Sequence, residues 1–159
     1  MRGKKNKDLA RKIQPDPRYN NVTLAKFINY IMERGKKTTA QNVVYQALEY
    51  IKKKDKRDPI EVFEEAVKNV SPQVEVRSRR VGGANYQVPI PVSAKRQRSL
   101  SYRWIIGAAA GKKGKPMAQK LADVLLESAQ NLGDAIKKRD YVHRIDEANK
   151  AFAHFARFR

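Results

Sequence analysis

The side chains best suited to chemistry in this sequence are closely spaced arginines. Arg77, Arg79 and Arg80 follow one another within one short segment, and the only carboxylate near them is Glu75. A guanidinium group is a planar fork of N–H donors that can bind a phosphate through two hydrogen bonds. Any single arginine could simply be a solvated surface charge. Three unpaired neighbours would repel one another, however, so the spacing favours a site for an anion.

The cationic character continues through the middle of the chain. No Asp or Glu occurs from Val76 to Ala122. Across 159 residues, 35 Lys and Arg against 16 Asp and Glu give a formal net charge of +19. Such a charge points to a nucleic acid, an anionic membrane or an acidic protein as the partner. The basic residues of the acid-free stretch are Arg77, Arg79, Arg80, Lys95, Arg96, Arg98, Arg103, Lys112, Lys113, Lys115 and Lys120.

Groups that could support catalysis or bind a metal are few. His143 and His154 are the only histidines, about three helical turns apart, and there is no cysteine. Asp146 and Glu147 near His143 could be drawn into a metal site, but the surrounding cations oppose it. The glycines of GAAAGKKGK lack the spacing and hydroxyl of a phosphate loop. We therefore expect no enzyme, metal, cofactor or small-molecule substrate. The opposing cations are Lys137, Lys138, Arg139 and Arg144.

Length and composition predict one folded domain outside the cell's membranes. The length is typical of one domain, and 41% hydrophobic residues can supply a core. No apolar run is long enough to span a bilayer, and residues 1–17 lack the apolar segment of a signal peptide. We expect a soluble, cytoplasmic protein, with an organelle not excluded.

Hydrophobic periodicity predicts six helices after a basic N-terminal arm. Residues 1–21 carry charge without an apolar period and are expected to be flexible, so the folded domain would cover 22–159. The first helix would run from about Leu24 to Gly35, and the second would begin at Thr38 or Thr39. Asp58 and Pro59 predict the start of the third. Its predicted core face is Phe63, Ala66, Val67 and Val70.

The remaining three helices follow the acid-free segment. The fourth is expected from a Ser93 cap through Leu100, Trp104 and Ala108 to Gly111. A fifth would run from about Pro116 to Leu132-Gly133. A sixth would begin at Asp134 and extend towards Asn149 or beyond.

Between the third and fourth helices the pattern changes to that of a β-hairpin at about 73–92. Gly82 and Gly83 separate two runs with β-branched residues, the second of which also holds Tyr86, and this is the spacing of a two-residue turn. That turn pairs Val81 with Ala84, Arg79 with Tyr86 and Arg77 with Val88. Prolines at 89 and 91 exclude further strands on that side. The fold class is mainly α, a six-helix single domain with one protruding hairpin.

Several motifs resemble the bacterial small-subunit ribosomal protein seven family. They are PDPRY at 15–19, NVSPQVEVRSRRVGGANYQVP at 69–89, Arg103-Trp104, and ANKAFAH at 148–154. The resemblance implies a primary rRNA-binding protein that binds the 3′ major domain of small-subunit rRNA and nucleates assembly of the head. It also implies a place near exit-site tRNA and mRNA, beside small-subunit proteins nine and eleven.

The resemblance also assigns residues. Together with Arg77 and the basic loop after the fourth helix, the rRNA-binding set is Arg2, Lys4, Lys5, Lys7, Arg11, Lys12, Lys36, Lys37, Arg77, Lys95, Arg96, Arg98, Lys112, Lys113 and Lys115. The set near exit-site tRNA and mRNA is Arg79, Arg80, Gly82, Gly83, Asn85, Tyr86, Arg144, Asn149, Lys150 and His154. The chain departs from the family pattern at Asn85, at Ile145-Asp146 and in its final FARFR.

Two alternatives remain at this stage. A sequence-specific DNA-binding protein would place its base-reading residues on one recognition helix, whereas the charge here is spread over arm, hairpin, loop and C-terminus. An RNA-processing enzyme would require an acid–base or metal constellation. Comparing RNA with duplex DNA in one titration separates the first alternative, and an rRNA cleavage assay separates the second.

Overall fold

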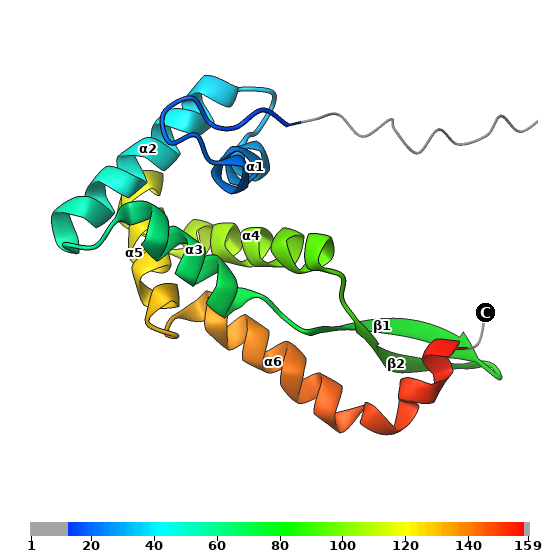
Figure 1. Ribbon diagram of the computed structural model, residues 1–159. Helices are drawn as coiled ribbons and strands as arrows, with labels where there is room; N and C mark the ends of the chain where they lie inside the picture. The colour runs from blue at the N-terminus through cyan, green and yellow to red at the C-terminus, as the bar shows by residue number, and fades with distance from the viewer. Residues whose placement is uncertain (1–12, 158–159) are drawn as a thin grey trace, which may run out of the picture. The chain divides into compact units, whose positions relative to one another are not determined.

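The computed structural model describes the backbone of residues 13–157 and the side chains of residues 13–153. The protein is mainly helical with one antiparallel hairpin, which confirms the predicted fold class (Figure 1). It forms two compact units that meet in sequence between Gln41 and Asn42, inside helix α2 (Lys37–Lys54). The predicted limit of the basic arm at residue 21 stays a prediction.

The first unit is built around a turn and helix α1 (Val22–Ile31). The buried Asp16 carboxylate accepts hydrogen bonds from the backbone N–H groups of Arg18 and Tyr19, both at 3.1 Å. The Asn21 side chain caps the helix by accepting from Thr23 and Leu24. Residues 13–21, placed in the arm from sequence, therefore include a defined turn and a helix cap.

Helix α1 ends earlier than the sequence predicts. Its last residue is Ile31, and Met32 already has extended backbone geometry while its N–H bonds to the Ile28 carbonyl. Gly35, predicted to terminate the helix, has a φ of 75° and closes the next turn. Gly35 therefore belongs to the turn that follows α1 and does not terminate the helix, so this prediction was wrong.

The second unit contains the rest of α2 and four further α-helices: α3 (Pro59–Val70), α4 (Ala94–Gly111), α5 (Met117–Ala129) and α6 (Asp134–Ala148). Helix α3 packs against α4 and α5, and α6 contacts α3, α4 and α5. Asp58 caps α3 by accepting from the Ile60 N–H, as its sequence predicts. The predicted core face of α3 is buried: Phe63, Ala66, Val67 and Val70.

The buried face of helix α4 does not include Leu100, Trp104 or Ala108, through which the sequence predicts this helix to run. Its buried residues are Ser101, Tyr102, Ile105 and Ala109, whereas Trp104 is only half-buried. Ser101 is tolerated in the core because its hydroxyl bonds to the Gln97 carbonyl and to the Ser71 hydroxyl. Trp104 therefore lies at the edge of the core.

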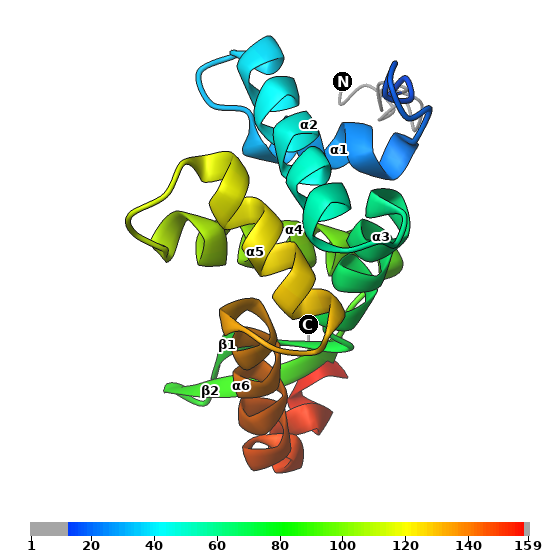
Figure 2. The same cartoon turned by 90° about the vertical axis from the view of Figure 1, so that its left-hand side faces the viewer.

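The hairpin consists of β1 (Val74–Val81) and β2 (Ala84–Pro91). Its register pairs Val81 with Ala84, Arg79 with Tyr86 and Arg77 with Val88, which confirms the predicted turn. Helix α6 contacts β1, and the following 3-10 helix η1 (Lys150–Arg157) contacts β2. Within the second unit the hairpin extends from α3 and α4, with α6 and η1 beside it (Figure 1, Figure 2).

Candidate nucleic-acid interface

The tip of the hairpin is a turn that glycine adopts readily, because both of its central residues have a positive φ. Gly82 and Gly83 have φ angles of 58° and 90°, the left-handed values needed at both central positions of a type I′ turn. Arg80 and Asn85 pair directly behind it and are exposed. Arg79 is half-buried opposite Tyr86. The tip therefore presents a small backbone turn flanked by a guanidinium and an amide.

At the base of the hairpin, Glu75 joins β1 to the start of α4. Arg96 donates two hydrogen bonds to its carboxylate, Nε to Oε2 at 2.9 Å and Nη2 to Oε1 at 2.7 Å. Arg77 lies on the same carboxylate at 3.5 Å. These partners, Arg96 before Arg77, hold the pKa of Glu75 below its ordinary value despite partial burial, which acts the other way. Arg96 is thus engaged within the protein.

The other predicted cations of α4 lie open to solvent. Lys95 and Arg98 are exposed, and neither has a carboxylate partner among the residues that the structure describes. Arg103, on the same helix, is also exposed. The resemblance does not place Arg103 in the rRNA-binding set. Its position in the acid-free stretch is the sequence feature that would add it to that set.

Within the described residues, the loop between α4 and α5 contributes one unpaired cation and two paired ones. Lys112 binds Glu127 at 2.5 Å, and Lys115 binds Asp123 at 2.9 Å. Lys113 is exposed and has no ion-pair partner within the described residues. The sequence could not separate these lysines, because both carboxylates come from α5, beyond the acid-free stretch.

The residues predicted near exit-site tRNA are brought together on one side of the second unit. The rings of Tyr86 on β2 and Phe152 on η1 lie 5.1 Å apart between centroids, tilted by 51°. Arg144 and Lys150 are exposed, while the Asn149 amide donates to the Ile145 carbonyl at 2.8 Å. The side chain of His154 lies outside the described residues.

Comparisons with known proteins agree with these features. A sequence model of the family described as "Ribosomal protein S7p/S5e" matches residues 3–150. The small ribosomal subunit protein uS7 of Thermosipho africanus is 56% identical over 92% of this chain and 94% of its own length. That of Methylibium petroleiphilum is 56% identical over 91% and 93%. This chain belongs to the S7 family of ribosomal proteins.

As an S7 family member, the chain is a structural constituent of the small ribosomal subunit and not an enzyme. The described part of the chain holds no helix long and apolar enough to cross a membrane. Within those same residues, no three His, Asp or Glu side chains come together as a metal would require. His143 instead accepts a hydrogen bond from the Gln73 N–H at 3.3 Å, which joins α6 to the segment before β1.

Some of the predicted rRNA-binding residues lie in the first unit or outside the described residues. Lys36 and Lys37 belong to the first unit, where both are exposed at the start of α2. The predicted arm contacts lie outside the described residues: Arg2, Lys4, Lys5, Lys7, Arg11 and Lys12.

Proposed function

We propose that this protein binds the 3′ major domain of small-subunit rRNA directly and nucleates assembly of the subunit head. The observation that carries the proposal is the exposed basic surface of the acid-free stretch. Lys95, Arg98 and Lys113 are open to solvent and have no carboxylate partner in the part of the chain whose side chains are described. Uncompensated lysines and arginines are the groups through which proteins bind a phosphate backbone.

The spacing of these cations suits an extended RNA contact. Helix α4 has 18 residues, so its two ends are about 27 Å apart. Lys95 and Arg98 lie near its first turn, whereas Lys113 follows its last. One rigid helix can thus hold phosphates from separated parts of a folded RNA at a fixed distance. That is the property an early assembly protein requires.

The hairpin tip and the end of α6 are the proposed surface near exit-site tRNA and mRNA. The Tyr86–Phe152 contact supports this assignment, because it keeps η1 beside β2. Arg80, Arg144 and Lys150 are exposed on these elements and supply positive charge for a polyanion. Neighbouring small-subunit proteins nine and eleven complete the proposed surroundings.

Hydroxyl-radical footprinting on small-subunit rRNA tests the rRNA assignment. Wild-type protein should protect backbone positions within the 3′ major domain. Arg98→Gln and Lys113→Gln should each weaken a separate group of protections, since the two side chains lie at opposite ends of α4. Lys68→Gln, an exposed lysine on α3, is the matched control. Protection confined to another domain, or none, would refute the proposal.

A ribosome assay tests the exit-site assignment. Subunits carrying Arg80→Gln together with Lys150→Gln should assemble normally but retain deacylated tRNA less well. Lys68→Gln again serves as the control. Normal retention of tRNA in correctly assembled variant subunits would remove this part of the proposal.

A further inference from the structure

A cleft between the end of α2 and the start of α5 is not used by the surfaces described above. It measures about 270 Å³ and is lined by Tyr50, Lys53, Lys54, Lys115, Gln119, Ala122 and Asp123. All seven residues belong to the second unit. Its volume is slightly below that of common small-ligand sites, so it suits one small planar group.

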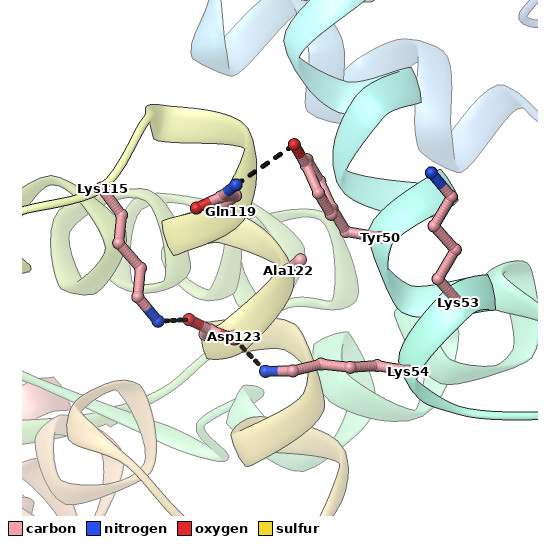
Figure 3. A pocket seen from close by; sticks show the side chains of 7 residues that line it. All are labelled: Tyr50, Lys53, Lys54, Lys115, Gln119, Ala122 and Asp123. Atoms are coloured by element: carbon pink, nitrogen blue, oxygen red, sulfur yellow. Dashed lines mark hydrogen bonds and ion pairs between the residues drawn. The ribbon is translucent and has the colours of Figure 1, made fainter.

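The charges in the cleft leave a net positive potential. Lys54 and Lys115 both bind Asp123, at 2.6 and 2.9 Å. These two partners, Lys54 before Lys115, hold the pKa of Asp123 below its ordinary value, so the carboxylate stays ionised at neutral pH. Lys53 points away from Asp123 (Figure 3). Lys53 has no carboxylate partner among residues 13–153, so one free ammonium group remains beside a doubly bound carboxylate.

Tyr50 gives the cleft an aromatic wall. The side chain is 37% exposed, and its hydroxyl accepts a hydrogen bond from the Gln119 amide at 3.2 Å. This bond holds the ring between α2 and α5, while the buried Ala122 leaves space below it (Figure 3). An oriented ring beside an uncompensated cation is the arrangement with which proteins hold a single nucleotide.

We infer that this cleft binds one unstacked nucleotide of single-stranded RNA, with its base against Tyr50 and its phosphate at Lys53. The inference rests on the proposed rRNA binding and extends that surface from the α4–α5 loop, through Lys115, to the end of α2. RNA is the favoured occupant, because Lys115, which lines the cleft, belongs to the same α4–α5 loop as the exposed Lys113. Only a residue freed from base stacking can present its face to the ring.

The direct test is an NMR titration of the full chain with three probes: adenosine 5′-monophosphate, a single-stranded hexanucleotide and inorganic phosphate. Both nucleotide probes should shift the Tyr50 ring and the Gln119 amide, the hexanucleotide at lower concentration. Tyr50→Leu should weaken hexanucleotide binding by about tenfold or more, as loss of one stacked base predicts. Tyr50→Phe keeps the ring but loses the bond from Gln119, so it should bind more weakly than wild type and more tightly than Tyr50→Leu.

The charge variant tests the phosphate contact. Lys53→Gln should lower the salt dependence of hexanucleotide binding by about 0.7 in the slope of log affinity against log salt. Lys68→Gln, remote on α3, should leave both affinity and slope unchanged. If Tyr50→Leu does not fold, the shift of the Tyr50 ring in the wild-type chain and the Lys53→Gln slope still decide the question.

Three results would overturn the inference. Equal shifts from inorganic phosphate and from the nucleotides would show a simple anion site without base stacking. Shifts at the α4–α5 loop but none at Tyr50 would remove the cleft while rRNA binding stands. If the wild-type chain binds no RNA at all, the result would instead refute the proposed function itself.

Discussion

Arg96 illustrates how a side chain's role depends on its partner. The resemblance to the S7 family implied an rRNA contact, yet Arg96 donates two hydrogen bonds to Glu75. The carboxylate is 18% exposed and the guanidinium 35%. A bidentate pair in this setting holds the hairpin base against α4. We therefore interpret Arg96 as a positioning residue, with Lys95 and Arg98 beside it as the direct contacts.

A double-mutant cycle distinguishes these two roles of Arg96. Arg96→Lys loses the planar fork and should lower the free energy of unfolding by about 1 kcal/mol, after allowance for solvent screening. The double variant Arg96→Lys/Glu75→Gln should lose less free energy of unfolding than the two single variants lose together. Arg98→Lys is the control and should stay within about 0.5 kcal/mol. Weakened rRNA binding without any loss of stability in Arg96→Lys would assign it to RNA instead.

The pH dependence of stability follows from Glu75 and Asp123. The folded protein holds each pKa below its ordinary value, 4.5 for Glu75 and 3.8 for Asp123, chiefly through Arg96 and Lys54. The stabilisation is therefore fully present above these values and is lost as the pH falls through the lowered folded values. Thermal unfolding at neutral pH should give wild type a higher melting temperature than Glu75→Gln or Asp123→Asn. The difference should shrink below pH 4.5 for Glu75→Gln and below pH 3.8 for Asp123→Asn. Differences that grow on acidification would contradict the assigned pairs.

At the scale of helices and strands, capping and turn residues predicted most element boundaries, whereas tertiary packing determined which faces are buried. The Asp58-Pro59 start of α3 and the Gly82-Gly83 turn are set by short-range backbone chemistry, so sequence suffices. The buried face of α4 is set by what packs on it, and a buried Ser101 cannot be recognised before its partner Ser71 is known. The pairing of Lys112 and Lys115 with α5 was hidden for the same reason.

The contact between η1 and β2 should stabilise the hairpin more than the helical core. Phe152→Ala removes the ring that packs on Tyr86, a contact worth about 0.5–1.5 kcal/mol. Amide hydrogen exchange in β2 should therefore accelerate about three- to tenfold, while α3 and α5 remain protected. Tyr141→Ala, an exposed aromatic on α6, is the control. Uniform acceleration across the helices would show that the contact supports the whole unit.

At the scale of the whole molecule, exposed cations without carboxylate partners among the described residues surround a helical core. The buried residues of α3 and α5 are apolar apart from Ser128, whose hydroxyl has no hydrogen-bond partner among the described residues. The α5 carboxylates Asp123 and Glu127 pair with three lysines, which are Lys54, Lys112 and Lys115. The acid-free stretch supplies most of the hairpin, α4 and the loop that follows, and it holds both paired cations such as Arg96 and exposed ones that are unpaired within the described residues. Unpaired cations such as Lys95, Arg98 and Lys113 can therefore be replaced singly with little effect on folding. The function can therefore be measured separately from stability.

The most direct measurement is a salt titration of binding to a 3′ major domain rRNA fragment, with duplex DNA of equal length in parallel. If several lysines and arginines replace condensed counterions, log affinity should fall against log salt with a slope steeper than about −4. Binding to the rRNA fragment should also exceed binding to the DNA at every salt concentration. A nearly flat slope, or equal affinity for both nucleic acids, would contradict the account.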